Sequence, residues 1–124
     1  MRYAKRLLDA LVTAGVPRIY FALDANHLFD EIATCGAEVV GVDWRTPLAE
    51  ANRRLGGRYA LQGNLDPCVL LATPEIVRAR AAAVLEEGRG LAGHVFNLGH
   101  GILPETPVEN ARALIETVQG AGRR

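Results

Sequence analysis

The chain has 124 residues, of which 49% are hydrophobic and 23% charged, the balance of a globular protein with enough apolar material for one core. Its 14 basic and 14 acidic residues cancel, so no net charge draws it to nucleic acid or to an anionic membrane surface. No apolar run approaches the roughly 18 residues of a membrane span, and residues 1–11 are charged and amphipathic rather than signal-like.

Hydrophobic spacing and turn residues predict a regular alternation of helices and strands. A leading helix over residues 2–14 carries an apolar stripe and is ended by Gly15 and Pro17. The stripe consists of Tyr3, Leu7, Leu8, Leu11 and Val12. Buried strands are expected over residues 18–23, 38–42, 58–62 and 93–98, and further helices over residues 26–35, 47–55, 74–87 and 107–118.

Three Thr-Pro pairs predict where helices begin. Thr46, Thr73 and Thr106 are expected as N-caps, with the proline that follows each of them as the first helical residue. Thr106 and Glu109 also have the spacing of a capping box, in which the two side chains bond each other's backbone nitrogen.

Four strand–helix units in succession imply parallel strands joined by right-handed crossovers, which is an α/β fold. The predicted strands are nearly continuous apolar runs, as strands buried on both faces are. Two architectures fit this pattern: a small open sheet, and a piece of an eight-stranded (β/α)₈ barrel. A complete barrel takes about 250 residues, so this chain would supply about half of one.

Unusual polar residues gather in the loops that leave the strands, whereas the loops that enter them are short and glycine-rich. The loops that leave the strands are residues 24–27, 43–45, 63–67 and 97–101. Ligands of parallel α/β folds bind at the carboxyl ends of the strands. The sequence therefore predicts a site there, lined by Asp, Asn, Trp and His side chains.

The sharpest motif surrounds His100, which lies between Gly99 and Gly101 just after the last strand. Flanking glycines let the backbone bend closely around a ligand. An imidazole there can donate to a carboxylate or move a proton near neutral pH. The alternative is an ordinary solvent-exposed loop histidine, and the spacing alone leaves both interpretations open.

Asp43 and Asn64 have structural alternatives to a role in a site. Asn64 and Asp66 can bond backbone groups of their own loop, the simpler interpretation for both. Asp43 could bind a cation or a pyrrole N–H, or it could cap its own loop while Trp44 packs under it.

No metal site is expected, because the three histidines have no ligand spacing and no metal-binding motif occurs. Cys35 and Cys68 have neither paired spacing nor metal-type neighbours. We interpret both as packing residues, and their reduced state favours the cytoplasm.

Three motifs resemble the uroporphyrinogen decarboxylase family in their order and approximate spacing: VGVDW (residues 40–44), LQGNLDPC (residues 61–68) and FNLGHGI (residues 96–102). The two longer motifs are highly specific when they occur together. The resemblance extends over essentially the whole chain but covers only the C-terminal portion of a family member. It implies that residues 1–124 are a single partial domain, the C-terminal half of a (β/α)₈ TIM barrel with about four parallel strands alternating with helices.

The resemblance implies an enzyme of heme biosynthesis that acts as a homodimer without metal or organic cofactor. The family removes the four acetate carboxyls of uroporphyrinogen III to give coproporphyrinogen III. His100 matches the family's substrate-binding histidine. Asn97, Gly99 and Gly101 belong to the same loop, and Asp43 and Asn64 are further candidates to line the site.

No catalytic residue is assigned within this chain. The family's catalytic Asp, its Arg-rich loop, a Tyr and a Ser lie on earlier strands that have no counterpart here, and Asp43 is not that Asp. The chain is therefore expected to be inactive alone and to pair with the missing N-terminal half. Residues 22–27 depart from the more glycine-rich loop of the family.

Two other functions are compatible with parts of the sequence. The related cobalamin-dependent methyltransferases share the barrel but hold zinc with a His-x-Cys pair and a distant Cys. Here the matching segment is Leu23-Asp24-Ala25, and His100 replaces the distant Cys. The third alternative is a non-catalytic half-barrel that associates with itself through two unpaired strand edges and a curved apolar face.

Overall fold

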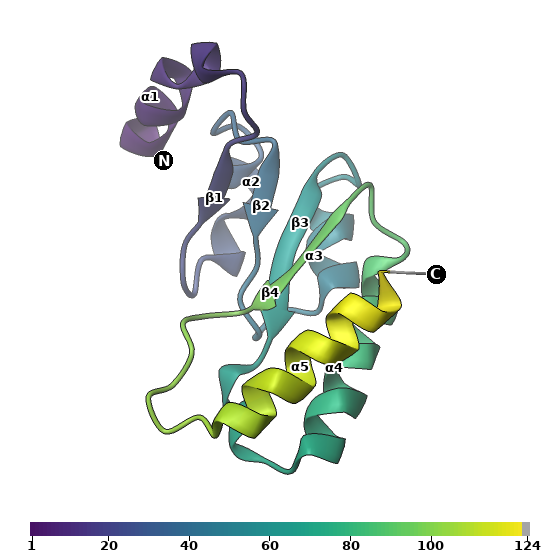
Figure 1. Ribbon diagram of the computed structural model, residues 1–124. Coiled ribbons are helices and arrows are strands. Elements are labelled where there is room, and N and C mark those ends of the chain that lie inside the picture. Colours follow the sequence, from purple (N-terminus) through teal and green to yellow (C-terminus); the bar gives the residue numbers. More distant parts are fainter. Residues whose placement is uncertain (123–124) are drawn as a thin grey trace.

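The computed structural model describes residues 1–122, in which four strands form one parallel sheet (Figure 1). The strands are β1 (Ile19–Phe21), β2 (Val39–Gly41), β3 (Ala60–Leu65) and β4 (His94–Leu98). Their spatial order, β1-β2-β3-β4, is the order of the chain, and every neighbouring pair is parallel. The predicted four parallel strands alternating with helices are confirmed.

Five α-helices accompany the sheet in the described residues. They are α1 (Arg2–Ala10), α2 (Phe29–Ile32), α3 (Leu48–Arg54), α4 (Pro74–Gly88) and α5 (Val108–Ala121). Short 3₁₀ segments occupy Val12–Ala14, Asn26–Leu28 and Pro67–Leu71. Figure 1 shows α2 and α3 behind the sheet, α5 lying along α4, and α1 set apart near the start of β1. None of the described helices is long and apolar enough to cross a membrane.

The first two helices are shorter than predicted. The helix expected over residues 2–14 ends at Ala10 and continues as a 3₁₀ turn up to Gly15, whose left-handed φ of 69° stops it. The helix expected over residues 26–35 divides into the 3₁₀ segment Asn26–Leu28 and the single turn of α2. Beyond Ile32 the backbone makes only turn-type bonds, such as that from Cys35 N to Ile32 O at 3.0 Å.

Strand β3 lies further along the chain than the prediction of residues 58–62. Gly63, Asn64 and Leu65, which were expected in a loop, pair with Phe96, Asn97 and Leu98 of β4. Pairing with a neighbouring strand has therefore outweighed the turn preference of the Gly-Asn dipeptide.

Two of the three predicted N-caps are wrong. Pro47 and Pro107, not the threonines before them, are the N-caps of α3 and α5, and both have extended ψ angles, of 142° and 135°. Thr46 Oγ1 instead accepts a hydrogen bond from Asn26 Nδ2 at 2.9 Å. Thr106 Oγ1 is buried without a partner among the described residues, so the capping box with Glu109 does not form. Thr73 is the N-cap of α4 and Pro74 its first residue, as predicted, although Thr73 makes no side-chain cap bond.

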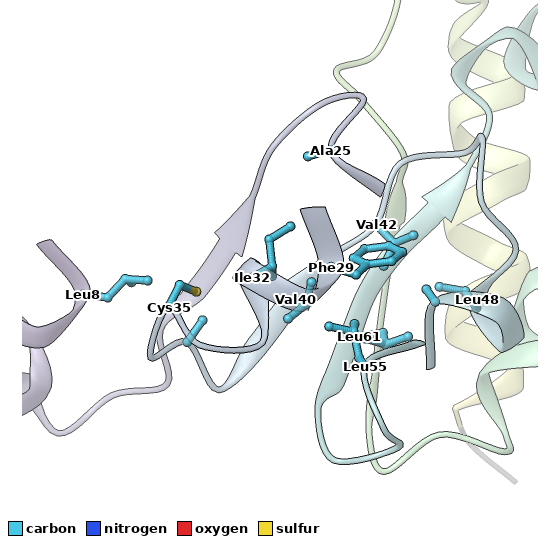
Figure 2. Close-up of a cluster of buried hydrophobic side chains, with 12 residues drawn as sticks. Leu8, Ala25, Phe29, Ile32, Cys35, Val40, Val42, Leu48, Leu55 and Leu61 are labelled. Atoms are coloured by element: carbon cyan, nitrogen blue, oxygen red, sulfur yellow. The ribbon is translucent and has the colours of Figure 1, made fainter. Parts of the chain in front are cut away.

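One hydrophobic cluster fills the space between the sheet and helices α2 and α3 (Figure 2). Val40, Leu48 and Leu61 are fully buried in it. Leu8 of α1 and Cys35 extend the cluster toward the N-terminus. The burial of Cys35 agrees with its predicted packing role, whereas Cys68 is exposed. Further buried side chains join the Pro67–Leu71 segment to α4 and α5: Leu70, Val77, Ala81 and Ala113.

Most of the apolar stripe of the leading helix is not buried by this chain. Only Leu8 is buried, while Tyr3 and Leu7 are 72% and 64% exposed. The spacing identified the helix correctly, but apart from Leu8 its apolar face is left largely uncovered by the described residues.

The second face of the sheet is also partly uncovered. Register places Phe21, Gly41, Gln62 and Val95 in one row across the four strands. Phe21 lies against Gly41, since a Cβ on Gly41 would be 2.8 Å from the Phe21 ring. Both Phe21 and Val95 remain more than 40% exposed. Opposite the helical core there is thus an apolar face that no helix of residues 1–122 covers.

Candidate functional site

An open cavity of about 470 Å³ lies beside the end of β4. Its walls come from the uncovered row of the sheet and from the loop after β4. The lining residues are Phe21, Gln62, Asn97, Leu98, His100, Gly101 and Ile102. The structure therefore brings the His100 loop to the carboxyl ends of the strands, where ligands of this class of fold bind.

His100 is exposed at this cavity, with its imidazole in a defined arrangement. The backbone N–H of Gly101 donates to Nδ1 at 2.7 Å. In a neutral imidazole one nitrogen accepts and the other carries the proton, so the proton of His100 is on Nε2 in this arrangement. The Nε2–H group is then available to donate to an acidic ligand.

The two glycines beside His100 have different roles. Gly99 is buried, and its N–H donates to Leu65 O at 2.8 Å. A Cβ on Gly99 would lie 2.4 Å from the backbone nitrogen of Trp44, so no side chain fits there. A Cβ on Gly101 would meet nothing within 4 Å. Gly99 thus allows a close approach between two loops of the chain, whereas Gly101 makes no such contact.

Asn97 lines the cavity, but its side chain is also used locally. Its Oδ1 accepts from the backbone N–H of Leu98 at 2.9 Å. Asn97 is exposed, and its side-chain NH₂ group is the part that could donate to a ligand.

Asp43 is buried and organises the loops around it. Its Oδ2 accepts from Asp24 N at 2.7 Å, and its Oδ1 accepts from Arg45 N at 2.9 Å. The Arg45 guanidinium is 3.4 Å from Oδ2. Since both carboxylate oxygens already accept bonds from the chain, the geometry favours the loop-capping interpretation of Asp43 over a ligand-binding one.

Asn64 is also buried and supports the same loop. Its Nδ2 donates to Asp43 O at 2.9 Å and to Thr46 O at 2.7 Å. Asp66 caps the 3₁₀ segment that follows β3, accepting from Cys68 N at 2.9 Å. Neither Asn64 nor Asp43 is among the residues that line the cavity. The local-bonding interpretation of Asn64 and Asp66 therefore has direct support.

Trp44 and Arg45 form a contact that the sequence did not indicate. The guanidinium carbon of Arg45 lies 4.1 Å from the centroid of the Trp44 ring, a cation–π arrangement. The Trp44 ring meets the His100 ring edge to face, with centroids 6.3 Å apart and planes at 85°. Trp44 thus contacts the candidate ligand-binding side chain rather than only packing beneath Asp43.

Two lining residues, Phe21 and Gln62, were missed at the level of sequence. They come from different strands and share one row only through strand register. Gln62 did carry a signal, because it is a polar residue inside an otherwise apolar strand. Within residues 1–122 no three His, Cys, Asp or Glu side chains converge as metal ligands would.

Comparison with known proteins gives one family along almost the whole chain. The sequence profile described as uroporphyrinogen decarboxylase (URO-D) matches residues 1–121. A uroporphyrinogen decarboxylase from Sorangium cellulosum is 49% identical over 123 residues, which are 99% of this chain and 34% of that protein. One from Salinispora tropica is 51% identical over 104 residues, which are 84% of this chain and 28% of that protein. The chain spans about a third of the length of these relatives, less than the half that the strand count suggested.

Among solved structures, a methyltransferase from Methanosarcina mazei superimposes with a TM-score of 0.77. The alignment covers 96% of this chain and 35% of that one, at 24% sequence identity. Such a likeness concerns the fold alone. Together with the four parallel strands, it confirms the predicted fold class, part of a (β/α)₈ barrel.

Proposed function

Because the chain belongs to the uroporphyrinogen decarboxylase family, we propose that it is the C-terminal part of an enzyme that converts uroporphyrinogen III to coproporphyrinogen III in heme biosynthesis. In this proposal residues 1–124 form a single partial domain of a carboxy-lyase. The observation that carries the proposal for the site is His100, which lines the cavity with its Nδ1 occupied by Gly101 N and its Nε2–H free.

The chemistry of the substrate suits this donor. Each step breaks the bond between an acetate methylene and its carboxyl carbon, releases CO₂, and leaves a methyl group once a proton has been delivered. The substrate presents carboxylates that hydrogen-bond donors must hold and orient. His100 would bind one of them through Nε2–H, and Asn97 would supply a second donor from the same loop. Gly99 and Gly101 would shape that loop, while Asp43 and Asn64 would hold the loop after β2 in place.

The step itself needs a buried carboxylate that stabilises the protonated pyrrole ring electrostatically. The resemblance places that Asp in the part of the family that this chain does not span. We therefore propose that the chain binds substrate but is inactive without the remainder of the barrel. No cofactor is required in this scheme.

The uncovered surfaces favour pairing with that remainder. The outer edges of β1 and β4 are unpaired in the described sheet, and Phe21 and Val95 are exposed on its helix-free face. The apolar face of α1 is also exposed, with Tyr3 at 72%. The N-terminal part of a family member would cover all three surfaces when it closes the barrel.

The test is reconstitution. This chain would be co-expressed with the N-terminal part of the Sorangium cellulosum relative, purified as a complex, and assayed for coproporphyrinogen. We expect product from the complex and none from the chain alone. Val95→Asp should abolish co-purification, whereas Val108→Asp, on the exposed start of α5, should not. Activity of the chain alone, or normal pairing of Val95→Asp, would contradict the proposal.

A substitution in the reconstituted enzyme tests the site. His100→Asn should lower kcat/KM roughly 10- to 100-fold, since a hydrogen bond to a charged group contributes about 1.5–3 kcal/mol. His27→Asn, at another exposed histidine, in the 3₁₀ segment that follows β1, is the matched control. Equal kinetics in the two variants would remove His100 from the proposed site.

The other two functions have less support. The methyltransferase neighbour shares only the fold, and no His-x-Cys pair occurs in the sequence. Self-association has one observation in its favour, because a second copy of the chain could also cover the Phe21–Val95 face. Light scattering of the purified chain separates the two cases. A chain that is monomeric alone and dimerises only with the N-terminal part supports the decarboxylase. A stable dimer of the chain alone supports self-association.

Two further properties of the complete protein are proposed from the family. It would be a homodimer, which light scattering of the reconstituted complex would show as two copies of each part. It would act in the cytoplasm, in keeping with the two free cysteines, Cys35 and Cys68. Fractionation of cells that express the tagged chain tests this location.

A further inference from the structure

Trp44 contacts the His100 side chain from a different loop. Trp44 follows β2, and His100 follows β4, so the contact crosses the position of β3 in the sheet. The rings meet edge to face at 6.3 Å and 85°, a favoured geometry for aromatic pairs. This contact reaches the exposed imidazole from outside its own loop.

The indole is itself held in place. Arg45 lies over its face at 4.1 Å from guanidinium carbon to ring centroid. Asp43 anchors Arg45 twice, through a 2.9 Å bond from the Arg45 backbone N–H and a 3.4 Å contact with the guanidinium. Because Asp43 is only 5% exposed and also accepts from Asp24 N, this anchor is part of the folded framework.

The backbones of the two loops are fixed relative to each other as well. Gly99 lies so close to Trp44 that a Cβ would be 2.4 Å from the Trp44 nitrogen. Gly99 N is bonded to Leu65 O at 2.8 Å, at the end of β3. The backbones that carry the imidazole and the indole are therefore held close together at the end of β3.

We propose that Trp44 is a positioning residue for His100. Its ring, clamped by Arg45 on the buried Asp43, limits rotation of the imidazole. Gly101 N holds Nδ1 at the same time, so that Nε2–H stays directed to the cavity. That the cavity receives a substrate carboxylate rests on the proposed function, but the contact between the two rings does not.

The sole tryptophan of the chain makes the contact directly measurable. The emission of the full chain at neutral pH would be compared among variants. His100→Gln should change the emission, because the imidazole edge no longer packs against the indole. His27→Gln, which removes a histidine elsewhere, should leave the emission unchanged. Identical emission in His100→Gln and the unmodified chain overturns the contact.

A second variant tests the clamp. In an Arg45→Gln background, His100→Gln should change the emission less than it does in the unmodified chain, because the indole is then free to leave the imidazole. Circular dichroism of Arg45→Gln should match the unmodified chain. An equal emission change in both backgrounds overturns the clamp.

In the reconstituted enzyme, Trp44→Leu should raise KM more than it lowers kcat, whereas Trp44→Phe, which keeps a ring, should largely restore the KM. Equal KM values in Trp44→Leu and the unmodified enzyme overturn the positioning role.

These results are separable from those for the proposed function. If the reconstituted complex produces no coproporphyrinogen while His100→Gln changes the emission as expected, the decarboxylase proposal fails and the contact stands. If the complex is active but His100→Gln leaves the emission unchanged, the decarboxylase proposal stands and the contact fails.

Discussion

The side-chain amide of Asn110 on α5 donates a hydrogen bond to the carbonyl oxygen of Leu70, 2.9 Å away and 40 residues earlier in the chain. The same Nδ2 also donates to Ala72 O at 2.7 Å. Asn110 is only 2% exposed, so both bonds are made away from water. They join the last helix to the segment between β3 and α4, where the backbone leaves regular structure.

Asn110→Ala should therefore lower the free energy of unfolding by about 1–3 kcal/mol, the cost of leaving buried polar groups without partners. Urea denaturation followed by circular dichroism measures this. Glu116→Ala, on an exposed position of the same helix, is the control and should change stability by no more than about 0.5 kcal/mol. Similar midpoints for the two variants would show that the Asn110 bonds contribute little.

Gly99→Ala should be poorly tolerated, although it adds one methyl group. That methyl would lie within 3.1 Å of Asp43 C and closer still to Trp44 N, and both are backbone atoms that cannot rotate away. We expect a loss of about 1–3 kcal/mol, typical of overpacking, and a displaced His100 loop. Gly101→Ala, where a Cβ meets nothing, should behave like the unmodified chain. If thermal denaturation ranks the two variants the other way round, the described loop packing is wrong.

Leu61→Ala tests the core beneath the sheet. Leu61 is fully buried on β3 and belongs to the cluster with Val40 and Leu48. Removing three carbons from such a position costs about 2–5 kcal/mol. Ile115→Ala, at a position that is 54% exposed on α5, should cost far less. Chemical denaturation of both variants gives the comparison, and an equal cost would contradict the burial of Leu61.

Acid stability should depend on the pair formed by Arg18 and Glu38. The Arg18 side chain, and then its backbone N–H, bond the Glu38 carboxylate and lower its pKa from 4.5 to about 2. A carboxyl group with a depressed pKa contributes stability that is fully present above its ordinary pKa and is lost as pH falls through the folded value. Stability should therefore fall between about pH 4.5 and 2 partly because of Glu38.

Glu38→Gln should reduce stability at neutral pH and flatten its dependence on pH in that window. Arg18→Gln should flatten the same window, because the pKa of Glu38 would return toward its ordinary range. Urea midpoints measured at several pH values test both variants. If stability falls with decreasing pH in Glu38→Gln as it does in the unmodified chain, other carboxylates cause that fall.

The type and order of the elements followed from the sequence, whereas several of their ends did not. Apolar runs such as that at Val39–Gly41 mark buried strands, and glycines with left-handed backbone, such as Gly15 and Gly36, mark the stops. The end of β3 depended on pairing with residues of β4 that lie 33 positions later, which no local pattern contains. The prediction of Thr46 and Thr106 as N-caps was wrong because the proline after each of them is itself the N-cap.

The candidate site was predictable only where its residues lie in a local motif. His100 could be identified because its neighbours form a distinctive local motif. Phe21 and Gln62 could not, because their common row exists only once three strands are in register. The Trp44–His100 contact could not be identified either, because the two residues lie 56 positions apart in the sequence. For Asp43 and Asn64 the residue types allowed two roles, and only the hydrogen-bond partners distinguish them.

The sequential strand order bears on how the chain can fold as it leaves the ribosome. Each strand adds to the free edge of the one made just before it, so no later strand has to insert between two that have already paired. A strand–helix unit can therefore dock as soon as it emerges, in keeping with the general N-terminal-first folding of nascent chains. Of the four described strands, β4 is synthesised last, and the loop with His100 follows it. The other three described strands can therefore already be paired when the candidate binding loop emerges.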